Sequence, residues 1–510
     1  MKLADLIAGE TVRAVNGDTG IEVAGLSYDS RKVKQGDLFF SLARDGEKNR
    51  DYLNEALNRG ARALVVRGWD GGAARPAAVV IECEQPRVLM AAAAARFFDA
   101  PSRRLDLVGI TGTSGKTTTA YLLASIFEAA GAPAGIIGTI GVFIGGRKIA
   151  SGLTTPESID FESALAQMES AGVRRVAAEI SSIGIEEGRA ERLNFRACIF
   201  TNFGRDHLDY HGTMEAYFAA KLRLFTELLA RSSHPDAVAV ACGDDPYGRR
   251  VLEASAGRKV SFGLERSRML DAYPLSARVG TGGIRAELSV MGRRIEVRSP
   301  LLGELNLLNI LGASAVSVAL GIDGDVVAEG LGRCPGAPGR LEAVPGPEGA
   351  TVLVDYAHKP DALEGVLRAL RALKPRRLVC VFGCGGDRDR GKRPLMGAIA
   401  GRMADLPVLT SDNPRTEDPL AIIAQVETGL VEAGLGRIDR DDAKRMRPGY
   451  IVEPDRRDAI AIALDLAKPG DIVVIAGKGH EDYQLVGARR LDFDDRTVVR
   501  ELMADRVKGL

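Results

Sequence analysis

The sequence predicts an α/β fold built on mostly parallel sheets, and three observations support this prediction. Apolar runs at residues 173–180 and 197–200 alternate with amphipathic stretches, and the alternation returns at 351–356, 360–373, 377–382 and 471–476. Such alternation is typical of βαβ units. Breaks rich in proline stand at 99–102 and 335–339. The length of 510 residues suits about three domains, which we expect at 1–100, 101–336 and 337–510.

Composition and charge exclude several classes of protein. Lysine plus arginine and aspartate plus glutamate each number 68, so the formal net charge is zero, which gives no support for a nucleic-acid partner. No uninterrupted apolar run reaches the roughly 18 residues of a membrane span, and residues 1–10 lack the apolar core of a signal peptide. The six cysteines are scattered, which indicates buried thiols in a reducing cytoplasm rather than a zinc site.

The first hundred residues predict a small unit of mixed secondary structure. Short apolar runs indicate strands at 36–42 and 63–66, and helices are expected near 52–59 and at 88–98. The break at 99–102 then separates this unit from the alternating pattern that follows.

A glycine-rich segment at 109–119 follows the apolar run 105–108 and predicts a strand, a turn and a helix. Backbone N–H groups of such a turn, together with the helix N-terminus, bind anions. Lys116 would reach the β- and γ-phosphates, and the Thr117 hydroxyl would bind Mg²⁺. Ile110 stands where the strict motif has glycine, so this is a variant phosphate loop, and a chance Gly/Thr turn is the alternative. The nucleotide-binding residues expected here are Gly112, Thr113, Ser114, Gly115, Lys116, Thr117 and Thr118.

Histidine is scarce, and four of the five histidines follow predicted strands, at His207, His211, His358 and His480. Ligands of open α/β sheets bind at this end of the strands. Glu179 also ends a predicted strand and, with His207 and Thr117, could hold Mg²⁺. A helix-capping or surface carboxylate is the alternative for Glu179.

Residues 384–394 combine a glycine turn with many cations. Guanidinium groups bind carboxylates and phosphates bidentately, so the segment favours anion recognition over a solvated run of charges.

Taken together, the phosphate loop and the segments 201–212, 355–360, 411–415 and 477–481 resemble the Mur ligases over essentially the whole chain, in the same order. The resemblance implies an N-terminal UDP-binding domain, a central phosphate-loop ATPase and a C-terminal Rossmann-like domain for an amino acid. It also implies ATP-dependent, ADP-forming addition of meso-2,6-diaminopimelate to the D-glutamate γ-carboxylate of a UDP-N-acetylmuramoyl dipeptide, in peptidoglycan precursor synthesis. A cytoplasmic monomer without nucleic-acid or membrane partners is expected.

The resemblance assigns roles to residues across the chain. It implies catalytic roles for Lys116, His207 and Lys221, with Lys221 carbamylated and bridging a second Mg²⁺. The expected metal ligands are Thr117, Glu179, His207 and Lys221. Further nucleotide contacts are expected at Asn306, Asn309, Arg340, Asp355 and His358. Contacts with the UDP-muramoyl dipeptide are expected at Tyr28, Ser30, Thr154, Thr155, Ser181, Glu187 and Arg189.

The choice of amino acid is expected to depend on Asp412, Asn413, Pro414 and Arg415. Diaminopimelate carries a second carboxylate that lysine lacks, and Arg415 can pair with it. The resemblance implies further contacts by Arg388, Gly477 and Glu481, with Glu481 placed for the distal ammonium.

The implied reaction has two steps. ATP phosphorylates the γ-carboxylate, and the amine then attacks the acyl phosphate, so the enzyme mainly positions reactants and neutralises charge. One alternative is folylpolyglutamate synthase, whose phosphate loop lies nearer its N-terminus. Another is a nucleotide-driven switch or transport ATPase, which would need neither Lys221 nor the segment 412–415.

Overall fold

The structure is a computed structural model that describes residues 1–43, 46–68, 78–150, 152–265 and 269–508. The chain divides into two compact units. The first unit comprises Met1–Pro274, Leu288–Ile295 and Leu308–Gly330, and the second comprises Leu275–Glu287, Glu296–Leu307 and Leu331–Leu510. The three domain boundaries expected from the sequence stay predictions.

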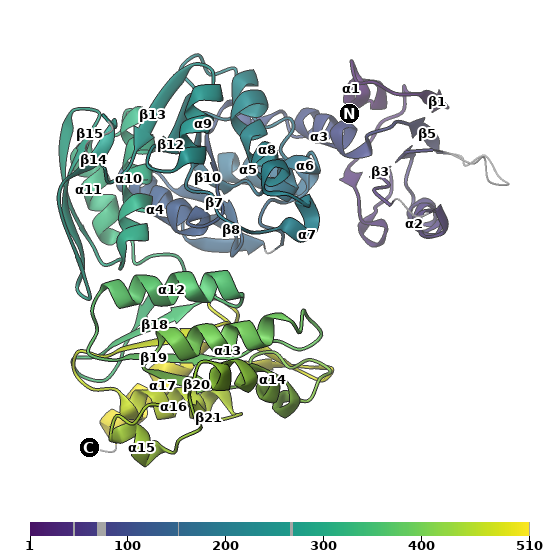
Figure 1. Ribbon diagram of the computed structural model, residues 1–510. Helices are drawn as coiled ribbons and strands as arrows, with labels where there is room; N and C mark the ends of the chain where they lie inside the picture. Colours follow the sequence, from purple (N-terminus) through teal and green to yellow (C-terminus); the bar gives the residue numbers. More distant parts are fainter. Residues whose placement is uncertain (44–45, 69–77, 151, 266–268, 509–510) are drawn as a thin grey trace. The chain divides into compact units, whose positions relative to one another are not determined.

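The N-terminal part of the first unit contains a sheet with the strand order β1-β5-β4-β3-β2 (Figure 1). Strands β2 to β5 pair in parallel and β1 is antiparallel to β5. The expected strand at 63–66 is confirmed, whereas the strand expected at 36–42 is confined to 38–40. The elements are α1 (Leu3–Ile7), β1 (Ala14–Asn16), β2 (Leu26–Ser27), β3 (Leu38–Phe40), α2 (Gly46–Asn58), β4 (Ala63–Val66), β5 (Val79–Glu82) and α3 (Pro86–Phe97).

The central sheet has the strand order β16-β15-β14-β13-β12-β11-β6-β10-β7-β8-β9. From β13 to β7 neighbouring strands pair in parallel, as the alternating sequence predicts. Its strands are β6 (Asp106–Thr111), β7 (Ala134–Gly138), β8 (Gly141–Ile144), β9 (Arg147–Ala150), β10 (Arg175–Glu179), β11 (Ala197–Phe200), β12 (Val238–Cys242), β13 (Arg258–Phe262), β14 (Ala272–Gly280), β15 (Gly283–Val290) and β16 (Arg293–Ser299). The helices are α4 (Lys116–Ala129), α5 (Ser158–Ser170), α6 (Ser182–Glu186), α7 (Leu208–His211), α8 (Met214–Arg223), α9 (Pro246–Ala254), α10 (Glu304–Ala319) and α11 (Gly324–Arg333).

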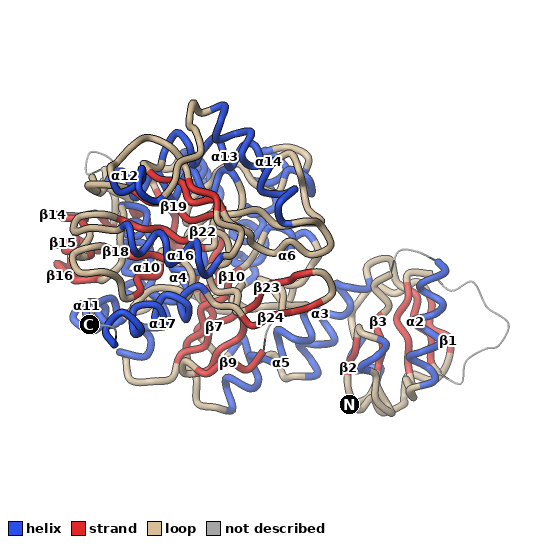
Figure 2. Tube along the Cα trace, turned by 90° about the horizontal axis from the view of Figure 1, so that it is seen from below, coloured by secondary structure: helices blue, strands red, loops and turns tan. Residues whose placement is uncertain are grey.

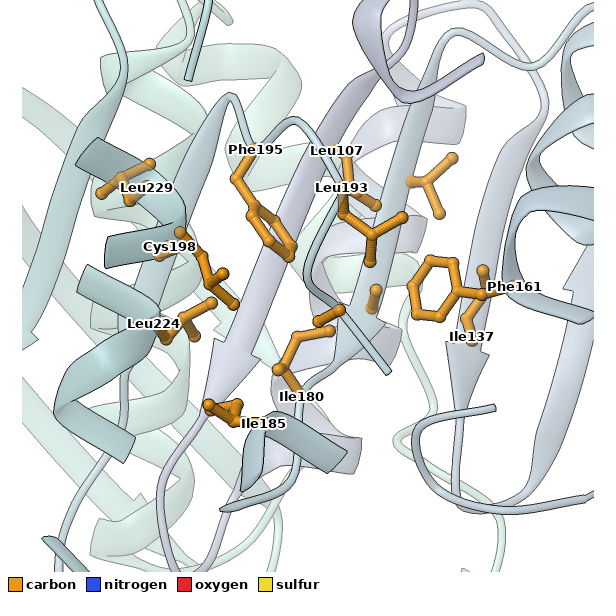
Figure 3. Packing of buried hydrophobic residues seen from close by; sticks show 14 of the residues in the cluster. Leu107, Ile137, Phe161, Ile180, Ile185, Leu193, Phe195, Cys198, Leu224 and Leu229 are labelled. Carbon is orange, nitrogen blue, oxygen red and sulfur yellow. The ribbon is translucent and has the colours of Figure 1, made fainter. Parts of the chain in front are cut away.

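Gly109 lies inside strand β6 and not in the phosphate turn, which corrects the sequence interpretation. A Cβ at this position would lie 2.9 Å from the Phe195 ring and 3.2 Å from the Cys198 sulfur. Figure 3 shows Phe195 in the core beside Leu107, Ile180 and Cys198. The absence of a side chain at Gly109 therefore serves the packing of this core, and the phosphate turn begins at Gly112.

The C-terminal sheet has the order β17-β18-β22-β19-β20-β21 with helices on both faces (Figures 1 and 2). In β19, Leu378, Cys380 and Phe382 belong to one hydrophobic core, while Val379 and Val381 belong to the other. This alternation explains why its strands are apolar throughout. The elements are β17 (Glu342–Val344), β18 (Thr351–Asp355), α12 (Pro360–Ala372), β19 (Leu378–Phe382), α13 (Lys392–Met403), β20 (Leu406–Leu409), α14 (Pro419–Glu432), α15 (Arg440–Lys444), β21 (Ile451–Val452), α16 (Arg456–Leu466), β22 (Ile472–Ala476), β23 (Tyr483–Val486), β24 (Arg489–Asp492) and α17 (Asp495–Lys508).

All six cysteines are buried free thiols, as expected. Within the described ranges, no helix combines the length and apolar character that crossing a membrane requires.

Glu162 of α5 gives the first unit a built-in pH dependence. Its side chain is buried, neither carboxylate oxygen has a hydrogen bond, and burial raises its pKa to about 8. The folded chain therefore binds one more proton than the unfolded chain between about pH 4.5 and pH 8, and stability falls as the pH rises through this window.

We predict that Glu162→Gln flattens this pH dependence, because the amide stays neutral. Each unit of pKa shift corresponds to about 1.4 kcal/mol, so the variant should melt several degrees above the wild type at pH 9 and close to it at pH 5. Thermal melting across this range is the measurement, with Glu128→Gln at an exposed position of α4 as the control. Parallel melting curves for wild type and Glu162→Gln would contradict the prediction.

Candidate functional site

The phosphate loop joins β6 to α4 through residues 112–115, which confirms the predicted order of strand, turn and helix. Gly112 and Gly115 have φ values of 142° and 86°. A Cβ would lie 2.0 Å from the Thr201 hydroxyl at Gly112 and 2.4 Å from the Asn309 amide oxygen at Gly115. Both positions therefore require glycine. Asn309, expected at the nucleotide, thus lies against the loop, and its oxygen also accepts a hydrogen bond from Thr119 at 3.4 Å.

The segment after β11 braces this loop. The Asn202 amide accepts a hydrogen bond from Ser114 N at 2.9 Å and donates to Ser114 O at 3.1 Å. The Thr113 hydroxyl accepts from Gly204 N at 3.0 Å and shares a hydrogen bond with the Tyr217 hydroxyl at 3.2 Å. Sequence reasoning missed Asn202. The signal was its place directly after the strand that pairs with β6, since neighbouring parallel strands end at the same edge.

Two lysine amines converge on one backbone oxygen of the loop. Lys116 Nζ donates to Gly112 O at 2.8 Å and to Thr113 O at 3.0 Å, and Lys221 Nζ donates to Gly112 O at 2.9 Å. Lys221 is 1% exposed, and its amine lies 4.6 Å from the centre of the Tyr217 ring. Burial and then the charge of Lys116 move its pKa well below the ordinary value, against the opposing effect of Asp206. The site therefore favours a neutral Lys221 amine.

Glu179, at the end of β10, lies close to two threonine hydroxyl groups beside the loop. Its carboxylate accepts hydrogen bonds from the Thr117 hydroxyl at 3.1 Å, from the Thr139 hydroxyl at 3.0 Å and from Thr139 N at 3.0 Å. Carboxylate and hydroxyl oxygens are the ligands that Mg²⁺ prefers, together with substrate phosphates. No cluster of three His, Cys, Asp or Glu side chains suited to a metal exists among the residues that the structure describes, so a Mg²⁺ here would draw on phosphate oxygens as well. Thr118 is buried in the first turn of α4.

Two of the expected histidines, His207 and His211, lie beside Tyr217. His207 precedes α7 with a φ of 53°, and its ring lies 3.4 Å from the Asp206 carboxylate and 5.9 Å from the Tyr217 ring centre. His211 shares a hydrogen bond with the Ser182 hydroxyl at 2.9 Å. Burial is the main cause of its lowered pKa, so the neutral imidazole is favoured.

Three of the residues expected to contact the muramoyl dipeptide lie next to Glu179. The Thr155 hydroxyl donates to Glu179 O at 3.0 Å and accepts from Ser181 N at 2.9 Å. Thr154 shares a hydrogen bond with Thr139 at 3.1 Å. Ser181 also caps α6 through Gly184 N. Thr154, Thr155 and Ser181 thus adjoin the oxygen cluster.

Arg189 and Glu187 belong to a network of four charges. Arg189 pairs with Glu187 and, at 3.2 Å, with Glu157, while Arg87 lies 3.1 Å from Glu157 and 3.5 Å from Glu187. Glu187 and Arg87 also line a cavity of about 440 Å³. The other lining residues are Ser41, Leu42, Ala43, Arg67, Gln85, Pro86, Val88, Glu186, Gly188, Glu191, Tyr210 and Arg223.

Tyr28 and Ser30 take part in hydrogen bonds within the first unit. The Tyr28 hydroxyl donates to Asp160, and Ser30 donates to Glu55 at 2.6 Å. Burial, followed by the hydrogen bond to Asp160, raises the pKa of Tyr28.

In the second unit, Arg340, Asp355 and His358 gather around the end of β18, whereas Asn306 lies on α10. Asp355 accepts hydrogen bonds from Leu341 N and Ala357 N, both at 2.8 Å, and the Arg340 guanidinium lies 4.8 Å from the Tyr356 ring centre. His358 forms a hydrogen bond between Nδ1 and Tyr356 O at 2.8 Å, and burial lowers its pKa. Asn306 donates to Leu302 O at 2.8 Å.

The loops after β20 and β22 come together as the sequence interpretation requires. Asn413 donates to Glu481 at 3.0 Å, and a Cβ at Gly477 would lie 3.2 Å from the Asp412 carboxylate. Arg415 has a φ of 52° and donates to Gly386 O at 2.7 Å. Burial, followed by the charge of Asp412, raises the pKa of Glu481. Pro414 is buried beside them, whereas Arg388 is exposed.

Sequence reasoning missed Lys478 in this group. Its side chain is completely buried, and its amine donates to Asn413 Oδ1 at 3.0 Å and lies 3.4 Å from Asp412. Its place between Gly477 and Glu481 was the available signal.

These features define a nucleotide-dependent enzyme of the phosphate-loop class. They are a glycine-rich loop with a buried lysine partner, an oxygen cluster at the edge of a parallel sheet, and a second α/β unit. Residues 110–317 match the Mur ligase middle domain, and residues 339–479 match the Mur ligase glutamate ligase domain.

Curated relatives match over nearly the full length. The UDP-N-acetylmuramoyl-L-alanyl-D-glutamate–2,6-diaminopimelate ligase of Geobacter metallireducens is 43% identical over 98% of both chains. That of Aquifex aeolicus is 40% identical over 94% of both. A solved structure of a ligase with this name has a TM-score of 0.70, with 32% identity and 99% coverage of both chains. The chain belongs to the Mur ligase family.

We predict that Lys116→Ala lowers ATP-dependent phosphate release by on the order of 10²-fold or more, since the variant lacks a charge placed where phosphate charge develops. Steady-state phosphate release is the measurement, and Lys148→Ala, at an exposed position of β9, is the control. Activity of Lys116→Ala within a few-fold of the wild type would rule out this role for the loop.

Proposed function

We propose that the chain is the ATP-dependent ligase that adds meso-2,6-diaminopimelate to the D-glutamate γ-carboxylate of UDP-N-acetylmuramoyl-L-alanyl-D-glutamate. The observation that carries the proposal is the 43% identity, over 98% of both chains, to a ligase of that name. Folylpolyglutamate synthase from Mycobacterium tuberculosis is 21% identical with a TM-score of 0.60, which reflects a common fold. The product is a peptidoglycan precursor.

In the proposed first step, the γ-carboxylate attacks the terminal phosphorus of ATP, so an acyl phosphate forms and ADP leaves. The backbone N–H groups of residues 115–118, at the start of α4, and the Lys116 amine hold the phosphates and stabilise their charge. Thr117 and Glu179 would hold a Mg²⁺ ion, which neutralises phosphate charge when bound. Two such ions are proposed, the second with His207 and Lys221 as ligands.

In the second step, an amino group of diaminopimelate attacks the acyl carbon, phosphate leaves, and the new amide loses a proton. Asn413, Arg415 and Glu481 would hold the amino acid and orient its reacting nitrogen. Arg388, Asp412, Pro414 and Gly477 are the other proposed contacts. No side chain forms a covalent bond to the substrate in this scheme.

The remaining assignments complete the proposal. The cavity beside Arg87 and Glu187 is assigned to the UDP-muramoyl dipeptide, because guanidinium groups pair with diphosphate oxygens. The other residues assigned to this substrate are Tyr28, Ser30, Thr154, Thr155, Ser181 and Arg189. Asn306, Asn309, Arg340, Asp355 and His358 are assigned to the nucleotide. Domains at 1–100, 101–336 and 337–510, a monomeric state and a cytoplasmic location are also part of the proposal.

The structure supports carbamylation of Lys221. Carbon dioxide reacts only with a neutral amine, and the lowered pKa of this buried lysine favours that form. The product is an anionic carbamate whose two oxygens can bind Mg²⁺, which an ammonium cannot do.

We predict that Lys221→Ala loses most ligase activity and that acetate, a small carboxylate, partly restores it. Protein equilibrated with ¹³CO₂ should show a carbamate resonance in the wild type and in Lys259→Ala, where the exposed lysine serves as control, but not in Lys221→Ala. A resonance of equal intensity in all three proteins would place the carbamate elsewhere.

The proposed function is tested by a substrate panel of meso-diaminopimelate and L-lysine. We predict a preference for diaminopimelate of at least about 10²-fold in kcat/KM, because each of the two charge-assisted hydrogen bonds of a bidentate pair contributes roughly 1.5–3 kcal/mol. Arg415→Ala should abolish most of this preference, whereas Arg402→Ala, at an exposed position of α13, should retain it. Equal use of both amino acids by the wild type would overturn the proposed substrate.

A further inference from the structure

The two loops proposed to bind the amino acid come from strands that do not pair with each other. Strands β20 and β22 both pair with β19, which lies between them. Neighbouring strands lie about 4.8 Å apart, so the two strands lie roughly 10 Å apart by the same spacing. No backbone hydrogen bond therefore joins β20 directly to β22, and the backbone bonds of the 412–415 loop to this part of the chain run to β23, where Arg415 N donates to Leu485 O at 3.0 Å and Gly487 N donates to Arg415 O at 2.6 Å.

Arg456, the first residue of α16, spans this gap. Its Nη1 donates to Ser411 O at 3.5 Å, and its Nη2 donates to Ala476 O at 3.1 Å. Ser411 and Ala476 are the residues directly before the two loops. One planar guanidinium thus joins the two chain segments at the points where they leave the sheet.

Asp495, the first residue of α17, fixes that guanidinium. Its carboxylate accepts from Arg456 Nε at 2.7 Å and from Nη2 at 2.8 Å, and both side chains are fully buried. This bidentate pairing sets the plane of the guanidinium, and its remaining N–H groups then point in fixed directions.

The contacts between the loops leave little room for displacement. The Cβ that Gly477 lacks would lie 3.2 Å from the Asp412 carboxylate and 3.8 Å from Arg456 Nη2. Asn413 joins Glu481 at 3.0 Å and receives the Lys478 amine at 3.0 Å. A small shift of one loop would therefore change how Asn413 and Glu481 face a ligand.

We propose that the Arg456–Asp495 pair is a positioning device that sets the spacing of the two amino-acid loops and through it the affinity and selectivity for the amino acid. This inference rests on the proposed function, because it takes these loops to be the amino-acid site. Arg456 and Asp495 act through backbone carbonyl groups and are positioning residues.

Asp495→Asn tests the proposal, because it keeps the shape of the side chain and removes the charge that orients Arg456. The KM for meso-diaminopimelate should rise at least about tenfold and the preference over lysine should fall, while the KM for ATP stays within about twofold. Arg456→Lys, which keeps the charge and loses the planar fork, should change the same constants in the same direction.

Asp471→Asn is the matched control. Asp471 is also fully buried and paired with an arginine, Arg376, at 2.8 Å, but it precedes β22 and lies at the opposite end of that strand from the loops. It should lower the melting temperature without changing the KM for diaminopimelate. Melting curves and ADP binding are measured for every variant, so that a general loss of structure is recognised.

Equal effects of Asp495→Asn and Asp471→Asn on the KM for diaminopimelate would overturn the positioning role. So would failure of both Asp495→Asn and Arg456→Lys to fold while Asp471→Asn folds, since the pair would then act through stability. A wild-type enzyme that does not use diaminopimelate would instead overturn the proposed function, and the two failures are therefore distinguishable.

Discussion

The carbonyl oxygen of Gly112 accepts hydrogen bonds from two lysine amines, Lys116 at 2.8 Å and Lys221 at 2.9 Å. Two ammonium groups that share one hydrogen-bond acceptor repel each other, and burial further disfavours the charged form of an amine. Because Lys221 is the fully buried partner, it is the amine whose charged form is disfavoured. Lys116 is only half-buried, and it is the amine that we propose to face the phosphates. One backbone oxygen is therefore shared by two lysines whose environments differ.

The order of the strands brings the other groups to the same edge of the sheet. In the sequence β11-β6-β10-β7, four neighbouring parallel strands end at one edge. The residues that follow them include Asn202 after β11, Gly112 after β6 and Thr139 after β7, while Glu179 is the last residue of β10. The phosphate loop, its brace and the oxygen cluster are consequently products of a single topological arrangement, and none of them requires a long loop.

Local patterns in the sequence were sufficient for the phosphate loop and for most strands, because a strand, a glycine turn and a helix follow one another within 24 residues of chain, from Asp106 to Ala129. The sequence pattern alone places the end of strand β6 too early, at residue 108. The strand continues because of tertiary pairing, in which Gly109 lies opposite Ala178 and Cys198. Asn202 was missed for a related reason, since its partner Ser114 is 88 positions away. The sequence also could not reveal that Arg456 pairs with Asp495, because each residue alone reads as an ordinary charge at the start of a helix.

Buried guanidinium groups are costly, and replacing a buried ion pair by apolar side chains often leaves stability unchanged or improves it. The second unit nevertheless retains two of them beside the proposed amino-acid loops. Arg393 is fully buried and binds both oxygens of Glu417, and it also donates to Gly385 O at 3.2 Å. Its hydrogen bonds, with one from Asp387 N, lower the pKa of Glu417 to about 2.

Arg393 and Arg456 have a similar geometry, because each pairs bidentately with a carboxylate and donates to backbone carbonyl oxygen, Arg393 to Gly385 O and Arg456 to both Ser411 O and Ala476 O. An apolar side chain could fill the same volume, but it could not hold carbonyl groups from separate segments at a set distance. Hydrophobic contacts have no preferred direction, whereas the guanidinium fork has fixed ones. The pattern is therefore better explained by the geometry that these loops need than by any contribution of the ion pairs to stability.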